Sequence, residues 1–214
     1  MHTEILTTDQ IAVLGGLKEV RGVGDFYLAG GTALALRMGH RRSVDFDFFR
    51  AEPFDGRLLR AGLETAFAPA IEWLPSGEQT LHVRLSRVSA SFFRLPYPLL
   101  EPVEASPWGF GLASEMDIAV MKVEAIAGRG SRRDFVDLRM LCARGFRLEE
   151  VLDGFDRKYG TTRADRYHRL RALAYFDDAE RQPMPDMLRP FDWAECRTFF
   201  ASEAARLLSE GIAG

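Results

Sequence analysis

Residues 30–49 read GGTALALRMGHRRSVDFDFF, and this segment decides the fold of the 214-residue chain. Two glycines open a stretch of strong helix formers, TALALRM, at 32–38. A basic cluster follows, and residues 44–49 then alternate with the two-residue period of a β-strand. The pattern predicts a tight turn, a helix and a strand that carries two carboxylates, Asp45 and Asp47.

The two aspartates share one face of the predicted strand, because side chains at positions i and i+2 point to the same side of a sheet. Val44, Phe46 and Phe48 point the other way, toward the core. The rise of a strand separates the carboxylates of Asp45 and Asp47 by about 7 Å. At this spacing they can hold one or two divalent cations, which activate an attacking oxygen and neutralise a leaving phosphate.

Gly30 and Gly31 stand between a predicted strand and a predicted helix. Glycine has no Cβ, so backbone amides can approach a ligand closely there, and the N-terminus of the helix favours negative charge. A triphosphate fits such a site. Two alternatives remain open: a tight turn without a ligand, with Thr32 as the helix N-cap, and an aspartate pair that only forms ion pairs with Arg41 and Arg42.

The flanking sequence of the N-terminal half has an α/β pattern, and the sequence after Ala105 is almost wholly helical. We therefore predict an α+β protein, with a mixed sheet and flanking helices in residues 1–104 and a helical domain in residues 105–214 that completes a shared cleft. The predicted helices are 8–22, 55–67, 115–127, 131–143, 147–158, 163–176 and 192–210, and the predicted strands are 25–29, 70–74, 79–86 and 88–95, the last two as a hairpin.

Composition excludes several classes of protein. With 47% hydrophobic residues the chain can bury a sizeable core, and its net charge of −3 does not suggest a protein that coats nucleic acid non-specifically. The sequence has no signal-peptide pattern and no long apolar run, so we expect neither export nor membrane insertion, and a cytoplasmic location. Cys142 and Cys196 are expected to be small buried residues in a reducing compartment.

A second set of charged residues lies in the helical half. Lys122 and Arg129 are seven residues apart, so they share a helix face if the helix extends that far, and two cations suit a triphosphate. Ser131 is expected to cap the next helix, in which Asp134 and Asp137 are adjacent at i, i+3. The alternative is that these are ordinary charges on solvated helix surfaces.

Four segments occur in a specific order: LAGGTALAL, HRRSVDFDFF, FFRLPYPLLEP and DIAVMKVEAIAGRGSRRDFVDL. Together they resemble the AbiEii/AbiGii-type nucleotidyltransferase toxins, a branch of the DNA polymerase β-like nucleotidyltransferase superfamily. The resemblance covers about residues 26–142, and four ordered motifs are more specific than any one of them. It implies a nucleotidyltransferase fold for the N-terminal half.

The resemblance also implies roles for particular residues. The turn at residues 30–32 would bind the nucleotide phosphates, Asp45 and Asp47 would bind Mg²⁺, and Arg41 and Ser43 would support the site. For Ser43, the end of an ordinary turn is an equally good interpretation.

In the helical half, the resemblance implies that Lys122 contacts phosphate together with Arg129. Asp134 or Asp137 would then be catalytic, or would hold the two cations in place. The apolar residues around Lys122 favour a functional role for it over a solvated helix surface.

One feature departs from the superfamily, in which many members carry a third carboxylate on a later strand as base or metal ligand. The matching segment here, VSASFFRL, offers only Ser89 and Ser91. His82 and His168 have no cysteine or serine partner at a recognisable spacing, which argues against a catalytic triad. Either two carboxylates suffice, or an acid such as Asp134 supplies the third oxygen, or the enzyme is weak.

The leading hypothesis is a Mg²⁺-dependent nucleotidyltransferase, in which an acceptor hydroxyl attacks the α-phosphate of an NTP and pyrophosphate leaves. The resemblance implies the toxin of a toxin–antitoxin (abortive infection) system, with tRNA as acceptor, a cognate antitoxin as partner, and neither DNA nor membrane involved. The alternatives are an antibiotic-type enzyme with a small-molecule acceptor and a catalytically inactive nucleotide-binding regulatory protein.

Overall fold

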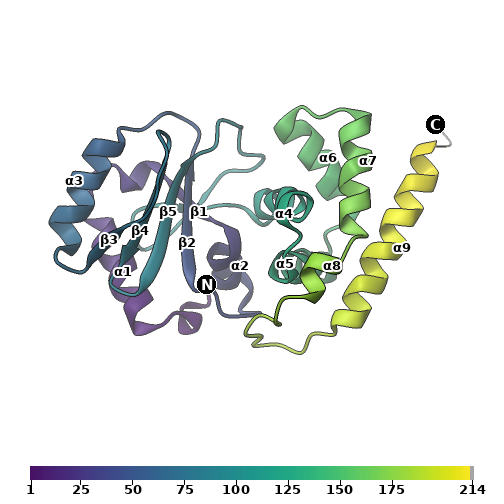
Figure 1. Ribbon diagram of the computed structural model, residues 1–214, viewed down its shortest axis with the longest axis horizontal. Coiled ribbons are helices and arrows are strands. Elements are labelled where there is room, and N and C mark those ends of the chain that lie inside the picture. Colours follow the sequence, from purple (N-terminus) through teal and green to yellow (C-terminus); the bar gives the residue numbers. More distant parts are fainter. Residues whose placement is uncertain (213–214) are drawn as a thin grey trace. The chain divides into compact units, whose positions relative to one another are not determined.

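The computed structural model describes residues 1–212 and contains two compact units, Met1–Ser114 and Glu115–Gly214 (Figure 1). The first unit is a β-sheet with helices packed on it, and the second is built from helices. This confirms the predicted α+β class. Each unit has a buried apolar core of its own.

The sheet of the first unit has seven strands within residues 1–212, in the order β3-β4-β5-β2-β1-β7-β6 (Figure 1). The strand β2 (Asp45–Arg50) runs antiparallel to β1 (Tyr27–Ala29) and parallel to β5 (Val88–Arg94), so the sheet is mixed, as predicted. The remaining strands are β3 (Ile71–Trp73), β4 (Thr80–Leu85), β6 (Glu104–Ala105) and β7 (Gly111–Leu112).

The helices of this unit begin at clear sequence signals. Thr7 and Gln10 form a capping box at the start of α1 (Thr8–Lys18), and the Asp55 carboxylate accepts two backbone N–H bonds at the start of α3 (Gly56–Phe67). The helix α2 (Gly30–Met38) follows β1 directly and ends at Gly39 in the left-handed conformation. Single-turn 3₁₀ helices precede α1 and β1, at Thr3–Ile5 and Val23–Asp25.

The two faces of the sheet differ in chemistry. On one face the buried rings of Phe48 and Phe92 stack at a centroid distance of 5.0 Å, and Leu81 lies beside the first residue of α3. Burial of these rings and of two leucines of α3, Leu59 and Leu63, supplies the hydrophobic stabilisation of the unit. By the two-residue alternation of strands, the opposite face carries Asp45 and Asp47 of β2, Ser89 and Ser91 of β5, and His82 and Arg84 of β4.

Several boundaries in the first unit differ from the sequence-based expectation. The helix predicted over 8–22 ends at Lys18, and the strand predicted over 25–29 begins only at Tyr27, because the 3₁₀ turn occupies Val23–Asp25. Residues 105–114 belong to the first unit, because β7 pairs with β1 in parallel. The helical half therefore begins ten residues later than the change of composition at Ala105 suggests.

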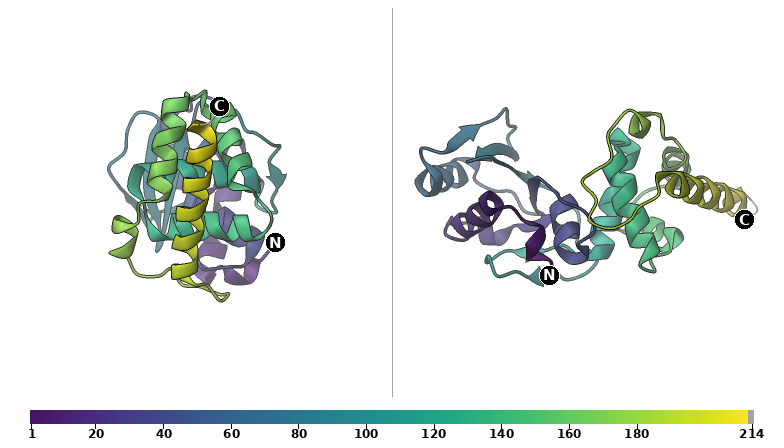
Figure 2. Two further views of the ribbon diagram at one scale, coloured as in Figure 1. Left: turned by 90° about the vertical axis from the view of Figure 1, so that its right-hand side faces the viewer. Right: turned by 90° about the horizontal axis from the view of Figure 1, so that it is seen from below.

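The second unit packs around α4 (Glu115–Arg129), which contacts α5, α6 and α7. The long C-terminal helix α9 lies along α7 (Figure 2). The helix predicted over 163–176 ends at Leu173, and a separate short helix, α8, follows it. The other helices are α5 (Arg132–Ala143), α6 (Leu148–Tyr159), α7 (Arg163–Leu173), α8 (Asp177–Glu180) and α9 (Trp193–Ile212).

The core of the helical unit contains an ion pair. Lys158 of α6 and Asp117 of α4 lie 2.8 Å apart, and both side chains are fully buried. Removing one partner of such a pair leaves an uncompensated charge inside the protein, which costs about 3–5 kcal/mol. The pair therefore fixes the register of α4 against α6.

The two thiols are free, with Cys196 buried and Cys142 half-buried. Burial raises the pKa of both thiols to about 12, so they are protonated at neutral pH and poorly nucleophilic. Over residues 1–212, no helix combines the length and the apolar character that crossing a membrane requires.

Candidate active site

The two glycines at the start of α2 allow charged side chains to pack against this turn. Gly30 has a φ of +66°, a region that favours glycine, and a Cβ there would lie 3.0 Å from Asp47 Oδ2. A Cβ on Gly31 would collide with the guanidinium of Arg41 and lie 3.0 Å from Ser43 Oγ. A carboxylate and a guanidinium therefore lie against the N-terminal end of one helix.

The aspartate pair has the geometry that the strand period predicts. Asp45 and Asp47 are half-buried on one face of β2, whereas Phe46 and Phe48 are fully buried on the other. Asp47 pairs in register with Ala29, the last residue of β1 before the glycine turn. The antiparallel β1–β2 pairing is therefore what brings a carboxylate to the N-terminus of α2.

Two residues predicted near the nucleotide form hydrogen bonds with Asp45. The Thr32 hydroxyl donates to the backbone carbonyl of Asp45, and Thr32 is only 1% exposed. The alternative in which Thr32 is the N-cap of α2 is wrong, because Ala29 occupies that position. The Ser43 hydroxyl donates a long hydrogen bond of 3.4 Å to the Asp45 carboxylate, and the Gln10 amide donates to the carbonyl of Ser43 at 2.8 Å.

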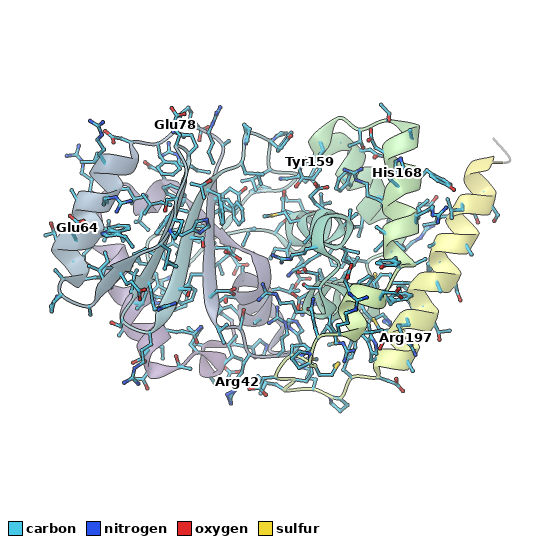
Figure 3. All side chains as sticks on the ribbon, viewed as in Figure 1. Arg42, Glu64, Glu78, Tyr159, His168 and Arg197 are labelled. Atoms are coloured by element: carbon cyan, nitrogen blue, oxygen red, sulfur yellow. The ribbon has the colours of Figure 1, made fainter. Side chains whose placement is uncertain are left out.

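The adjacent arginines differ in environment. Arg41 is buried with its guanidinium against Gly31, and one of its nitrogens donates to the carbonyl of Arg42 at 2.8 Å. Arg42 is exposed on the segment that leads into β2 (Figure 3). Burial against the turn makes Arg41, and not Arg42, the cation of the glycine turn.

The position beside Asp47 on β5 holds a hydroxyl. Ser89 and Ser91 are the register partners of Asp45 and Asp47, so no carboxylate stands at the place of the superfamily's third acid. The Ser91 hydroxyl lies 2.9 Å from Nδ1 of His82, its partner across the β4–β5 hairpin. The expectation that His82 lacks a serine partner is therefore wrong, and counting residues outward from the predicted hairpin turn could have found this pair.

The donor chemistry of this face suits a hard divalent cation. Asp45 and Asp47 supply carboxylate oxygens, and Mg²⁺ is commonly held by one or two carboxylates together with water and substrate phosphates. Within residues 1–212, no group of three or more His, Cys, Asp or Glu side chains is placed to hold a metal. Among the described residues, a third protein ligand at this face would therefore be an oxygen of another kind, such as a hydroxyl or a backbone carbonyl.

The helical unit contains a buried charge cluster. The Lys122 ammonium lies 2.8 Å from Asp134 Oδ1 and 2.7 Å from Asp137 Oδ2, and both carboxylates are fully buried. Arg129 donates through Nε and Nη2 to the two oxygens of Asp134, at 2.9 and 3.1 Å. Ser131 is the N-cap residue of α5, as predicted, and its hydroxyl donates to the Asp134 carboxylate instead of accepting a backbone N–H.

The two cations of the cluster differ in how much of each side chain is exposed to solvent. The Lys122 side chain is 5% exposed, whereas that of Arg129 is 55% exposed. Lys122 and Arg129 both lie on α4, which continues through Gly128 and ends where Gly130 takes a φ of +54°. The helix predicted over 115–127 therefore extends to Arg129, and Lys122 and Arg129 lie on the same helix.

Asp134 is ionised far into the acid range. Burial by itself would raise the pKa of its carboxyl, but the Lys122 ammonium and the Arg129 guanidinium outweigh burial and hold the pKa well below its ordinary value of 3.8. The cluster is therefore a preformed set of opposite charges at neutral pH.

The chain shares its fold with a solved nucleotidyltransferase. MenT4, a nucleotidyltransferase toxin of Mycobacterium tuberculosis, is similar with a TM-score of 0.62 at 22% identity, over 93% of this chain and 81% of the MenT4 chain. JHP933 of Helicobacter pylori is similar with a TM-score of 0.54 at 17% identity, over 99% of this chain and 92% of that chain. At these identities the likeness shows a shared fold.

Sequence comparison gives the family. Residues 13–107 match the family described as "Nucleotidyl transferase AbiEii toxin, Type IV TA system". An uncharacterized protein of Aquifex aeolicus is 39% identical over 188 residues, which are 86% of this chain and 88% of that protein. The chain belongs to the AbiEii family of nucleotidyl transferase toxins.

The glycine turn generates a prediction for stability. Gly30→Ala should lower the free energy of unfolding by about 1–3 kcal/mol, because the positive φ is strained for alanine and the Cβ meets Asp47. Gly15→Ala is the matched control: nothing lies within 4 Å of a Cβ at this position in α1, so it should stabilise by about 0.5–1 kcal/mol. Urea unfolding measures both, and equal effects would contradict the packing described for the turn.

The charge cluster generates a prediction for pH dependence. Because the folded pKa of Asp134 is lowered, its contribution to stability is complete above the unfolded pKa of about 3.9 and is lost as the pH falls toward the folded pKa. Asp134→Asn should therefore cost about 3–5 kcal/mol at pH 7, and this difference from wild type should shrink below pH 4.

The matched control is Asp153→Asn, which removes an exposed partner of Arg166 and should cost less than about 1 kcal/mol at any pH. The measurement is denaturant unfolding between pH 2.5 and 7. A pH-independent cost for Asp134→Asn would show that the cluster does not stabilise the unit through its charge.

Proposed function

We propose that this nucleotidyltransferase moves a nucleoside monophosphate from an NTP to an acceptor hydroxyl in a Mg²⁺-dependent reaction. The observation that carries the proposal is that the Asp47 carboxylate lies beside Gly30 at the N-terminus of α2, where a Cβ on Gly30 would stand 3.0 Å from Asp47 Oδ2. A helix N-terminus attracts anionic phosphates, and a carboxylate attracts a cation. Both attractions act at one turn, which suits a metal–triphosphate complex better than either partner alone.

In this reaction the acceptor oxygen forms a bond to the α-phosphorus while the bond from that phosphorus to the pyrophosphate oxygen breaks. The bound Mg²⁺ would neutralise charge on the phosphates and favour ionisation of the acceptor hydroxyl. Asp45 and Asp47 would hold the cation, and the amides of the glycine turn together with Arg41 would orient the triphosphate. Thr32 and Ser43 act indirectly, because their hydroxyls hold Asp45 in place.

The charge cluster of the helical unit is proposed to take part in nucleotide binding through Arg129. This side chain is half exposed, while its Nε and Nη2 donate to Asp134. Lys122 and Asp137 are buried, which suits positioning roles in which they fix Asp134 and, through it, the guanidinium. Arg129 would then offer a preoriented positive charge to an anionic group.

The proposed acceptor is tRNA, and the proposed setting is a toxin–antitoxin pair in the cytoplasm. The support is the family, whose description names a toxin and a toxin–antitoxin system. Under this proposal a cognate antitoxin limits the activity of the chain in its own cell. An antibiotic-type acceptor and an inactive nucleotide-binding protein are alternative outcomes of the experiments below.

The proposed chemistry predicts that Asp45→Asn and Asp47→Asn each lower nucleotide transfer roughly a thousandfold. The reason is that a metal supplies several kcal/mol of transition-state stabilisation, and about 1.4 kcal/mol corresponds to a factor of ten. Both variants should keep the wild-type unfolding midpoint, because each loses one of two like charges on a half-buried face. The measurement is incorporation of each of the four labelled NTPs into total RNA with Mg²⁺.

The control variant is Glu72→Gln, which removes an exposed carboxylate of the same sheet, paired with Arg84 at 2.7 Å. It should transfer label at the wild-type rate. Label in tRNA supports tRNA as the acceptor. Label only in an added small hydroxyl compound would instead indicate an antibiotic-type enzyme with a small-molecule acceptor. Wild-type transfer by either aspartate variant would refute the metal assignment.

The toxin role predicts growth arrest that depends on the chemistry. Expression in a host that lacks the neighbouring genes of the source locus should stop growth for wild type and for Glu72→Gln. Growth should continue with Asp45→Asn or Asp47→Asn at equal protein levels, because transfer is lost. Toxicity that persists without the two aspartates would show that binding, not transfer, arrests growth.

A further inference from the structure

Ser91 and His82 extend the row of Asp47 across the open face of the sheet. His82 on β4 pairs with Ser91 on β5, Ser91 pairs with Asp47 on β2, and Asp47 pairs with Ala29 on β1. Register partners on adjacent strands point to the same face, and neighbouring strands are about 4.8 Å apart. The hydroxyl of Ser91 therefore lies on the same face as the Asp47 carboxylate, one strand away.

The imidazole of His82 is held in a fixed position. Its ring packs edge-on against Phe93 at a centroid distance of 5.4 Å, and Nδ1 lies 2.9 Å from Ser91 Oγ. The backbone of His82 is also held by the segment after β3, because its N–H donates to Ser76 Oγ and its carbonyl accepts from the N–H of Leu74. A fixed ring gives the Ser91 hydroxyl one preferred direction.

We propose that Ser91 Oγ is the third protein oxygen that binds the divalent cation of the aspartate face, and that His82 is its positioning residue. When neutral His82 carries its proton on Nε2, Nδ1 accepts the hydroxyl proton of Ser91, so the lone pairs of Oγ are available to a cation. A partner that orients a metal ligand in this way raises the ligand's basicity. This inference rests on the proposed function, which places the cation at Asp45 and Asp47.

The second serine of this face, Ser89, provides a contrast. It pairs in register with Asp45 on one side and with Arg84 on the other. Arg84 forms an ion pair with Glu72 at 2.7 Å, so the row of Ser89 continues into a guanidinium rather than into a hydrogen-bond acceptor. A guanidinium has no acceptor atom and repels a metal cation. Ser89 is therefore the matched control for Ser91.

The proposal has a consequence for charge. A serine ligand leaves the face with two negative charges from protein, where a third carboxylate would give three. Cation affinity rises with the number of charged ligands. The chain should therefore bind a divalent cation without nucleotide more weakly than its own Ser91→Asp variant.

The experiment is a titration of the full-length protein with Mn²⁺ alone, followed by electron paramagnetic resonance of the free ion. Ser91→Ala should raise the Kd for Mn²⁺ about tenfold, and Ser89→Ala should leave it unchanged. His82→Phe should raise the Kd about as much as Ser91→Ala. The double variant should be no weaker than Ser91→Ala, because His82 acts only through Ser91.

The outcomes separate this inference from the proposed function. If Asp45→Asn loses Mn²⁺ binding while Ser91→Ala binds as wild type, the metal face stands and the serine ligand is refuted. If Asp45→Asn also binds as wild type, the metal is elsewhere and both proposals fail. Additional weakening by His82→Phe in the Ser91→Ala background would make His82 a ligand itself and refute its positioning role.

The Ser91→Asp variant provides a second test of the proposal if Ser91→Ala does not fold. It keeps a polar side chain on the half-buried face and should lower the Kd for Mn²⁺ at least tenfold. In the Ser91→Asp background, adding His82→Phe should leave the Kd for Mn²⁺ unchanged, because a carboxylate needs no imidazole to orient it. An unchanged Kd for Ser91→Asp would refute the proposal even if Ser91→Ala cannot be purified.

Discussion

The contact between the Asp47 carboxylate and the glycine turn is the constraint on which the site depends. Asp47 can reach the N-terminus of α2 only because Gly30 has a positive φ and no Cβ. The antiparallel β1–β2 pairing places Asp47 beside Ala29 and the glycine turn. The parallel β2–β5 pairing places Ser91 on the other side of Asp47. The half-buried face of the sheet thus carries Asp47, Ser91 and His82 side by side on neighbouring strands. Phe48 and Phe92 are buried on the opposite face.

The helical unit positions charge by a different physical route. Its buried carboxylates are compensated by cations at 2.7–2.9 Å, in the Lys122 cluster and in the Lys158–Asp117 pair. Buried ions are costly unless they are paired, so the loss of one partner would leave an uncompensated charge among the helices around α4. The guanidinium of the half-exposed Arg129 is held in place by Asp134, which is itself held by Lys122 and Ser131.

The sequence contained much of this arrangement, since the relevant patterns are local. A two-residue period placed Asp45 and Asp47 on one face, and helix spacing placed Lys122 with Arg129. The Ser91–His82 pair depends on hairpin register, which spacing alone did not supply. The strand β7 has two residues, too few for any periodicity. Thr32 shows a third limit, because only the fold reveals that its hydroxyl bonds to the backbone of Asp45.

The central claim is that the aspartate face and the glycine turn together bind a metal–nucleotide complex. The most direct measurement is a crystal structure with Mn²⁺ and a non-hydrolysable NTP, in which anomalous scattering locates the metal. We expect a peak about 2.1 Å from carboxylate oxygens of both Asp45 and Asp47, with phosphate density at the amides of Gly30 and Gly31. A metal or a triphosphate bound elsewhere, with this face empty at saturating ligand, would contradict the claim.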